Sequence, residues 1–380
     1  MASFFRAFTK RFFILVTLLV AGLFLLACSA WWLEPGQRWW VGILGVGFGI
    51  LCIATIALVL FWVVARSRWF MLPLAAMAIG WQPLNAFFAL HPFAATQEAK
   101  TAGSLRVMQW NVARFDEMNH PPGSGASKRK QMLDYIRQQN PDIICMQEFL
   151  ETHNSKLLQP NIRYFRDTLG FKYYAYAMDH RRRDSLYEHG IAIFSKFPIT
   201  HTERYKFGGP KSFQADESYA YADIVVEGQT IRVFTTHLQS LLLGKKELES
   251  VEEMKTRKEV NIDESKGIFK KFRQAYVFRQ QQAAKIRQAL DTSAYPVIIC
   301  ADFNDVPNSY VYHHIRGDRK DAWASKGFGV GRTFSNISPT LRIDYIFTDP
   351  RFTVAQVRTP HHRLSDHYPV IADLLLPGDK

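Results

Sequence analysis

Long apolar stretches dominate the start of the chain, whereas the rest alternates short apolar runs with charged segments. The long stretches cover about 12–33, 39–65 and 69–90. Each approaches the roughly 20 residues that a helix needs to cross a bilayer. Polar residues and prolines interrupt only the third stretch, which fits a kinked span or a re-entrant segment. The pattern predicts an anchor of about three transmembrane helices.

The apolar region is expected to form an anchor over 1–98, followed by a linker at 99–104 and a second domain over 105–377. Basic residues set the expected orientation, because cytoplasmic loops are enriched in Lys and Arg. They cluster before the first stretch and between the second and third: Arg6, Lys10, Arg11, Arg66 and Arg68. With three crossings, this multi-pass protein of the cell membrane would hold its second domain outside the cytoplasm, and with two crossings inside.

A signal peptide is the alternative interpretation of the N-terminus. The run from Leu25 to Cys28 resembles a lipoprotein cleavage site. Two further apolar stretches follow it, however, and they would make such processing unnecessary.

Eight short apolar runs after residue 104 predict β-strands. They are LRVMQWN, DIICMQE, GIAIFS, YADIVVE, IRVFTTH, PVIICADFN, RIDYIF and PVIADLLL. Several are apolar throughout, as expected for strands that are buried on both faces. Helices are expected at 127–139 and near 272–290, and a hairpin is expected to turn at Gly228. The second domain is therefore predicted to be α/β.

A charged insertion at 244–271 interrupts this alternation. Its composition is typical of a solvated helix or a mobile loop. It also directly follows a candidate site residue, so the alternative is a lid or a substrate-contacting segment.

Charge and cysteine usage add little. The chain has a net charge of +13, and the part after residue 100 has 40 basic and 32 acidic residues. A basic domain favours anionic partners such as phosphoesters, nucleic acid or acidic lipid headgroups. Four cysteines lie in apolar or strand-like runs, which predicts buried thiols without a disulfide framework: Cys28, Cys52, Cys145 and Cys300.

Polar residues fall at the ends of the predicted strands. Five close a strand and three open one or come just before it: Asn111, Glu148, His237, Asp302, Asn304, then Asp344, Asp366 and His367. In a mixed sheet these ends share one edge, so the side chains can converge. Clustered carboxylates repel unless a cation offsets them. Oxygen-rich donors without thiolates suit Mg²⁺ or Mn²⁺.

Six motifs in order resemble the endonuclease/exonuclease/phosphatase (DNase I-like) superfamily over 105–376. They are QWNV (109–112), MQE (146–148), THL (236–238), ADFND (301–305), RIDYIF (342–347) and SDHYPV (365–370). The resemblance implies a four-layer α/β sandwich of two mixed β-sheets flanked by helices, here preceded by about three transmembrane helices.

The resemblance also implies roles for the metal-binding side of the site. Glu148 matches the principal ligand of a Mg²⁺ or Mn²⁺ ion, helped by Asn111 and by Asp366 through water. Asp302 matches the residue that orients or deprotonates the attacking water. Asn304 would hydrogen-bond the phosphoryl oxygens of the substrate.

Two histidines complete the implied site. His367 would face the phosphate and be held by Asp344, and His237 would donate toward the leaving group. His237 stands where many repair endonucleases have Tyr, and Glu188 would support it, as in the deoxyribonuclease branch. Ala113 stands where repair nucleases have Asp, which argues against the repair branch.

Other candidates lack a motif. Arg182 lies in a basic run of three arginines, which either steers an anionic substrate or is an exposed turn. His189, His361 and His362 are expected to be surface or loop residues.

These observations predict a membrane-anchored, divalent-metal-dependent phosphoester hydrolase that uses direct water attack, either a phosphodiesterase or phosphatase or a nuclease. The expected substrate is a lipid headgroup, nucleic acid or an inositol or sugar phosphate. The alternative is a non-catalytic membrane receptor or scaffold that retains the fold. The number of metal ions and the oligomeric state stay open.

Overall fold

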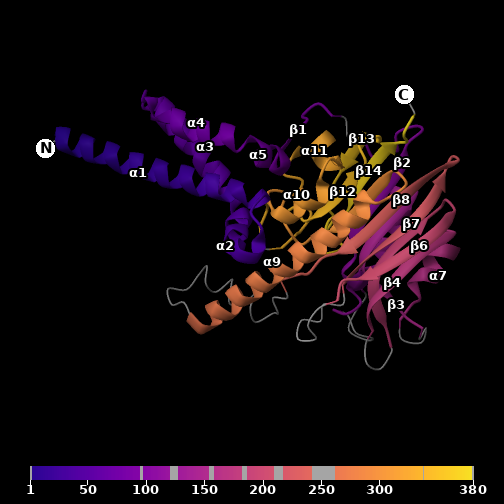
Figure 1. Cartoon of the computed structure of the whole chain (residues 1–380). Coiled ribbons are helices and arrows are strands. Elements are labelled where there is room, and N and C mark those ends of the chain that lie inside the picture. The colour runs from indigo at the N-terminus through magenta and orange to yellow at the C-terminus, as the bar shows by residue number, and fades with distance from the viewer. Residues whose placement is uncertain are drawn as a thin grey trace. The chain divides into compact units, whose positions relative to one another are not determined.

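The computed structural model describes residues 2–94, 97–119, 127–153, 158–181, 186–208, 217–241, 262–336 and 338–378. The chain forms two compact units. Unit 1 is drawn from 1–88, 241–281 and 306–314, and unit 2 from 89–240, 282–305 and 315–380. Figure 1 labels helices and strands of both units.

Unit 1 consists mainly of apolar helices. They are α1 (Ala2–Cys28), α2 (Pro35–Val46), α3 (Phe48–Val64), α4 (Met71–Ile79) and α5 (Trp81–Phe87), with short 3₁₀ turns at Ser29–Trp31 and Arg68–Phe70. The unit also includes the first part of α9 (Ile262–Asp291) and most of α10 (Tyr310–Arg316). Segments that lie far apart in the sequence therefore belong to unit 1.

The helices differ from the three predicted spans. Among the described residues, one helix, Phe4–Trp31, is long and apolar enough to cross a membrane. The second stretch is a pair, Pro35–Val46 and Phe48–Val64, bent by 59° at Gly47. The third stretch yields only the shorter helix Arg68–Ile79. The prediction of about three spans is therefore corrected to one, or two if the bent pair crosses as one span.

Glycine explains where the third stretch breaks. Helix α4 ends at Gly80 and α5 begins at the next residue. A Cβ atom at Gly80 would lie 2.5 Å from Cys28 Sγ and 2.8 Å from the ring of Phe24, so only glycine allows this close approach. The extracytoplasmic placement of the second domain depended on a third crossing and loses that support.

Unit 1 exposes large apolar side chains that a water-soluble fold would bury. They lie along α1 and α3 and include Leu15, Leu19, Ile50, Ile53 and Leu60. The interior holds hydroxyls and small residues (Thr17, Thr55, Ala21 and Cys52) beside large apolar side chains such as Phe24 and Phe48. Small and polar residues between helices are typical of packing within a bilayer.

Unit 2 contains two six-stranded sheets. The first sheet has the order β10 (Lys320–Asp321), β12 (Asp344–Thr348), β9 (Val297–Asp302), β8 (Gln229–His237), β7 (Ser218–Val226), β6 (Ile199–Lys206). The second has the order β13 (Thr353–Arg358), β14 (Val370–Leu375), β2 (Leu105–Asn111), β3 (Ile143–Glu151), β5 (Glu188–Ser195), β4 (Tyr173–Arg181). A small pair, β1 (Ala89–Leu90) and β11 (Phe328–Gly329), lies apart.

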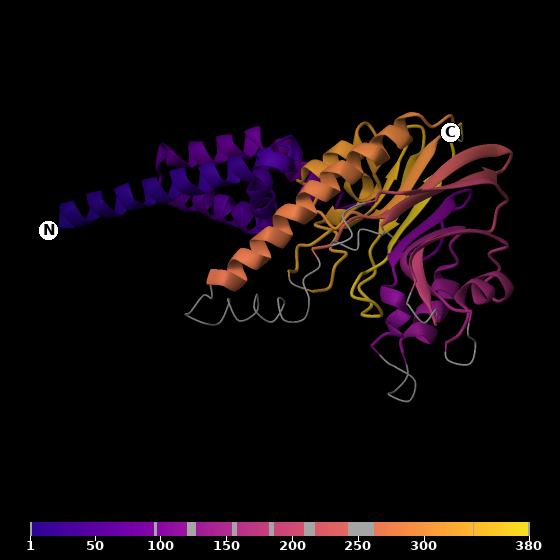
Figure 2. The same ribbon diagram turned by 60° about the horizontal axis from the view of Figure 1, so that its bottom comes forward.

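Both sheets are mixed. Only β2 with β3 and β8 with β9 pair in parallel, and the other neighbours are antiparallel. Strands distant in sequence are brought together, as Figure 2 shows for the magenta and yellow strands that include β2 and β14. The eight predicted strands are all present, and the hairpin turns at Glu227 and Gly228, both with positive φ.

One apolar core fills the space between the sheets. It includes Val107 and Ile143 from the second sheet and Val233, Ile298 and Ile346 from the first. A second core lies on the outer face of the second sheet, where α6 (Arg129–Gln139) and α7 (Asn161–Asp167) cover it. The C-terminal part of α9 lies along the first sheet. Two mixed sheets flanked by helices confirm the predicted α/β fold.

The helix predictions were confirmed, with different limits. The helix expected at 127–139 is α6, which ends at Asn140 in a left-handed conformation just before Pro141. The helix expected near 272–290 is part of α9, which begins ten residues earlier, at Ile262. The predicted charged insertion therefore ends inside a helix, and its part at 244–261 lies outside the described residues.

Candidate active site

The polar residues at the strand ends meet at one edge of the two sheets. In the first sheet, His237 and Asp344 both pair with Asp302 in the strand register. In the second, Asn111 ends β2 beside Gln147 of β3. The parallel strands β8 and β9 end at this edge, and β12, which is antiparallel to β9, begins there. The sheet topology therefore brings these side chains together.

Asp302 lies at the centre of this cluster and is fully buried. Its Oδ2 accepts a hydrogen bond from Asn111 Nδ2 at 3.0 Å, and its Oδ1 accepts one from the backbone N–H of Asn304 at 2.9 Å. The same Oδ2 lies 3.5 Å from His237 Nε2 and 3.7 Å from His367 Nδ1. A carboxylate held from four sides has a fixed orientation.

His367 forms an ion pair with Asp344. Its Nδ1 lies 2.9 Å from Asp344 Oδ2, and both residues are buried. Burial alone would lower the pKa of His367, but the carboxylates of Asp344 and Asp302 outweigh it and raise the pKa to about 10. The imidazole is therefore protonated at neutral pH, and the other oxygen of Asp344 accepts a hydrogen bond from Gln109 Nε2 at 3.0 Å.

Glu148 is aimed at the site by an irregularity in β3. The register between β3 and β5 shifts between Met146 and Phe149, and Glu148 has a φ of 49°. A β-bulge of this kind re-aims a side chain, often beside a functional site. Burial opposes ionisation of Glu148, yet the positive charges of His237, Arg114 and His367 outweigh it and lower its pKa.

An open pocket of about 560 Å³ adjoins Glu148. Its lining includes carboxylates, basic side chains and amides: Asp116, Glu148, Asp366, Arg114, Lys128, Arg363, Asn119 and Asn336. Part of its wall is the turn Ala113–Asp116, in which four successive residues have φ between 43° and 61°. Left-handed backbone in such residues is strained, by roughly 1–2 kcal/mol each.

The donor set fits a divalent metal ion. Glu148 and Asp366 line the same pocket with carboxylate oxygens, the ligands that Mg²⁺ prefers. Asn111 Nδ2 lies 3.5 Å from Glu148 Oε1, so its amide would have to turn over to offer oxygen. Positive charge beside Glu148 comes from Arg114, whose Nε lies 3.1 Å from Glu148 Oε2.

A second cluster of possible metal ligands contains two carboxylates and a histidine. Asp302, Asp344 and His367 offer ligand atoms that all lie within 4.8 Å of one another. Because His367 carries a proton there, its ring offsets one of the two carboxylate charges. The Glu148 side of the site differs, because it offers oxygen donors that face a pocket.

Asn304 lies beside Asp302, as predicted, with a φ of 51°. Its Nδ2 donates to the carbonyl of Leu238 at 2.9 Å, which ties the end of β9 to the residue after His237. The side chain of Asn304 thus also has a structural partner.

Glu188 is held by residues other than His237. Its Oε2 accepts a hydrogen bond from Arg181 Nη2 at 2.7 Å, and its Oε1 lies 3.7 Å from His153 Nε2. Asp179 in β4 is a further carboxylate that interacts electrostatically with His237. Burial raises the pKa of Asp179 to about 6, opposed by Ser218, Arg204 and His237. The role expected for Glu188 toward His237 stays a prediction, and Arg182 lies outside the described residues.

Two residues near Glu148 were not predicted. Arg114 follows the QWNV motif by two positions, and nothing in its local sequence marks it. His189 was expected on the surface or in a loop, but it lies in β5, where burial and then Arg114 lower its pKa to about 4. Its position directly after Glu188 at the start of a buried strand was the available signal. His361 and His362 are exposed, as expected.

Comparison with known proteins gives two family matches. A model described as "Endonuclease/Exonuclease/phosphatase family" matches residues 108–367, and a domain of unknown function (DUF8431) matches residues 10–87. The first match includes Glu148, His237, Asp302, Asp344 and His367, while Asn111 lies near its start.

A curated relative and two solved structures are similar over the same region. Protein angel homolog 2 from Danio rerio is 23% identical over a comparison of 290 residues that covers 71% of this chain and 44% of that protein. The chain thus spans less than half of the length of this relative. An endonuclease/exonuclease/phosphatase from Beutenbergia cavernae has a TM-score of 0.50 at 20% identity, covering 72% of each chain. The human Nocturnin catalytic domain has a TM-score of 0.49 at 16% identity, covering 73% of this chain and 96% of that one.

Proposed function

Because the chain belongs to the Endonuclease/Exonuclease/phosphatase family, we propose that it is a divalent-metal-dependent phosphoester hydrolase, tethered to a membrane by its N-terminal helices. The observation that carries the proposal is the environment of Asp302. A buried carboxylate that contacts Asn111, His237 and His367 has no evident structural purpose. Perturbed, clustered titratable groups of this kind gather at catalytic sites.

Asp302, His367 and His237 have different roles in the proposed hydrolysis. Asp302 orients the attacking water and takes its proton as the water oxygen bonds to phosphorus. The protonated ring of His367 donates to a phosphoryl oxygen and stabilises the charge that develops there. The ester P–O bond then breaks, and His237 gives a proton to the departing oxygen.

A metal ion would be held by Glu148, with Asn111 and Asp366 beside it. When bound, a divalent ion such as Mg²⁺ or Mn²⁺ supplies Lewis-acid polarisation of a phosphoryl oxygen. Asn304 is proposed to orient the same phosphoryl group, and Asp344 to keep His367 protonated and in position. Asp179 takes the supporting role toward His237 that the sequence had suggested for Glu188.

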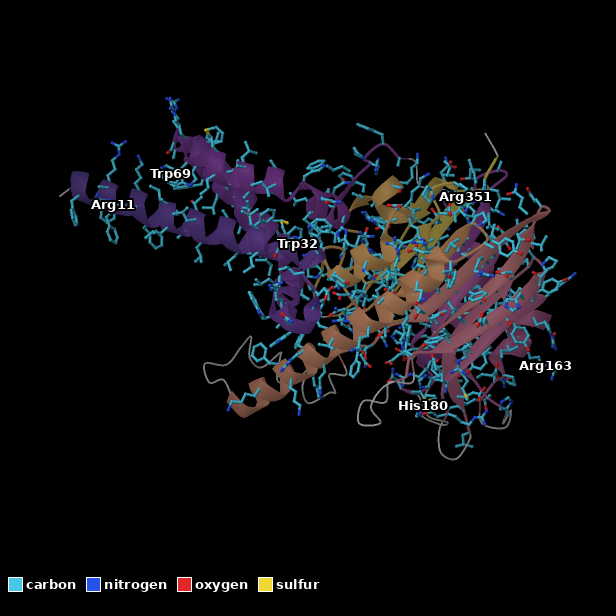
Figure 3. All side chains as sticks on the ribbon, viewed as in Figure 1. Arg11, Trp32, Trp69, Arg163, His180 and Arg351 are labelled. Atoms are coloured by element: carbon cyan, nitrogen blue, oxygen red, sulfur yellow. The ribbon has the colours of Figure 1, made fainter. Side chains whose placement is uncertain are left out.

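Membrane tethering is supported by the surface of unit 1. Soluble proteins rarely expose large contiguous apolar patches. Helices α1 and α3 expose leucine, isoleucine and phenylalanine while they bury Thr17 and Thr55. In Figure 3, Arg11 and Trp69 lie toward one end of these helices and Trp32 toward the other, as expected for residues at two membrane interfaces.

The alternative function is a non-catalytic receptor or scaffold that retains the fold. A receptor would have no reason to keep both the buried carboxylate Asp302 and its charged neighbour His367. The ion pair between His367 and Asp344 also costs desolvation energy that a purely structural site avoids with apolar residues. The site therefore favours catalysis.

The test uses the full chain in detergent, because segments of α9 and α10 belong to unit 1 and a truncated chain would expose them. Phosphate release and ester cleavage are measured with Mg²⁺ or Mn²⁺ on duplex DNA, RNA, phospholipids and inositol phosphates. Turnover of one class that disappears with EDTA and with Asp302→Asn establishes the enzyme and its substrate class. Turnover that persists in Asp302→Asn contradicts the proposed mechanism, and no turnover of any class by a folded chain favours the receptor.

A further inference from the structure

A second pocket lies in unit 1, where the N-terminal part of α1 meets the C-terminal end of α3. Its volume is about 730 Å³, within the range of ligand-binding pockets. Its lining comes only from these two segments: Phe5, Arg6, Thr9, Lys10, Phe13, Phe61, Trp62, Ala65, Arg66 and Ser67. No motif of the catalytic site contributes to it.

The pocket carries unbalanced positive charge. Arg6, Lys10 and Arg66 line it, and within 2–94 the only acidic residue is Glu34, which precedes α2. Among the described residues, none of these three cations forms an ion pair. Clustered cations without a counter-charge repel one another, so an anionic ligand would stabilise this end of the helices.

The backbone at the end of α3 sets the position of Arg66 in the pocket. Helix α3 ends at Val64, and Arg66 has a φ of 49°, with its N–H bonded to the carbonyl of Val63. The next N–H, of Ser67, bonds back to the carbonyl of Trp62 at 3.0 Å. This left-handed helix end turns the chain at Arg66, which fixes where its side chain leaves the helix.

The floor of the pocket is apolar and firmly held. The rings of Phe13 and Phe61 lie 4.4 Å apart, and the buried Trp62 donates its indole N–H to Thr17 Oγ1 at 2.8 Å. Exposed apolar side chains continue away from the pocket, with Val64 83% and Phe5 72% exposed. Cations above an apolar floor match a molecule with a charged head and hydrocarbon tails.

We propose that this pocket binds the phosphate of an anionic phospholipid, with Arg6, Lys10 and Arg66 around the headgroup and the acyl chains along the apolar flank of α1 and α3. The inference rests on the proposed membrane tethering. Basic pockets between membrane helices at the interface recognise acidic headgroups in this way. The site would make stability of unit 1 depend on lipid composition.

The chain offers a matched pair of variants. Arg6→Gln with Arg66→Gln removes one arginine from α1 and one from the segment after α3, both in the pocket. Arg11→Gln with Arg68→Gln removes the same charges from the same two segments, but neither residue lines the pocket. Diffuse attraction to a charged surface treats the two pairs alike, whereas a bound headgroup does not.

The full chain in neutral detergent is titrated with short-chain phosphatidylglycerol, short-chain phosphatidylcholine and inorganic phosphate, and the melting temperature is followed at each ligand concentration. Phosphatidylglycerol is expected to raise the melting temperature and the other two ligands are not. The pocket pair is expected to weaken phosphatidylglycerol binding roughly 20- to 30-fold, and the Arg11/Arg68 pair less than about threefold.

Three outcomes overturn the proposal. Equal weakening in both pairs indicates diffuse attraction, equal binding of phosphatidylcholine indicates a purely apolar contact, and competition by inorganic phosphate indicates a soluble anion as the ligand. Membrane fractionation tests the proposed tethering separately from the lipid site. If the chain is released from membranes without detergent, tethering itself fails; if it stays in the membrane and shows no phosphatidylglycerol preference, only the lipid site fails.

Discussion

Unit 2 encloses apolar side chains between its sheets and gathers charge at one edge, whereas unit 1 exposes apolar side chains and encloses hydroxyls. In unit 2, burying Asp302 and Asp344 requires the compensating charge of His367. In helices α1 and α3 of unit 1, the buried polar side chains Thr17 and Thr55 are neutral, and Thr17 accepts a hydrogen bond from Trp62. We therefore expect substitutions of buried polar side chains to have large effects in unit 2 and small effects in unit 1.

The largest effect is expected for Asp302→Asn. An amide cannot take the proton of the attacking water, so kcat/KM should fall by about 10³-fold. The measurement is hydrolysis of the identified substrate at saturating metal, with Asp167→Asn, an exposed change of the same kind, as the control. Loss of less than about threefold would remove Asp302 from the role of base.

Asp344→Asn should have the next largest effect. Without this carboxylate, burial dominates and the pKa of His367 falls from its value of about 10. Activity near neutral pH should drop by about 10²-fold, and the remaining activity should rise as the pH is lowered, because protonation of His367 is then restored. A kcat/KM profile against pH checks this, and an unshifted profile with a uniform loss would mean that Asp344 acts only on stability.

Glu117→Gln tests a buried charge beside the pocket. Burial raises the pKa of Glu117 to about 7, opposed by Arg129 and aided by Glu151. The folded state therefore holds this proton more tightly than the unfolded state, so Glu117 lowers stability as the pH rises from about 4.5 to about 7 and the loss persists above that.

The glutamine variant should remove this dependence. At pH 8 it should be more stable than the parent chain, by at most about 3 kcal/mol, while the two should match near pH 4.5. Thermal unfolding at both values measures the difference. Equal stability at pH 8 would show that Glu117 is ionised without penalty in the folded chain.

Thr17→Val should have the smallest effect. It removes the acceptor of the Trp62 indole N–H inside unit 1, and hydrogen bonds between membrane helices contribute only about 0.6 kcal/mol on average. Unfolding of the full chain in mixed detergent measures it. Thr55→Val is the control, because Thr55 bonds only within its own helix, to Leu51. A loss above about 2 kcal/mol would mean that unit 1 is organised like a water-soluble core.

The strands that the sequence predicted and those it missed differ by position in the sheet. The predicted strands are mostly central and buried, such as β2, β3 and β9. The missed strands β4, β6 and β13 all lie at the sheet edges, where β6 is largely exposed and β4 is mostly half-buried. An edge strand needs no continuous apolar run, so its sequence lacks the pattern by which strands are recognised.

The site shows a similar division. Motif residues such as Asn111, Asp302 and His367 were predictable, because they stand at predicted strand ends and within family motifs, which can be recognised in the sequence. Arg114 and Asp179 were not, since each reaches the site from a segment whose local sequence carries no sign of it, and His189 was marked only by its position directly after Glu188. Similarly, Glu188 was assigned to His237 by sequence position, but its ion pairs are with Arg181 and His153.

The sequence by itself determined the α/β class, the eight buried strands, the apolar N-terminal region and the residues at the strand ends, because periodicity and composition are local properties. Tertiary structure decided the rest. It bent one apolar stretch at Gly47 and broke another at Gly80, it drew parts of α9 and α10 into unit 1, and it set the charge state of His367. These depend on which atoms approach one another across the fold, and no local pattern encodes those distances.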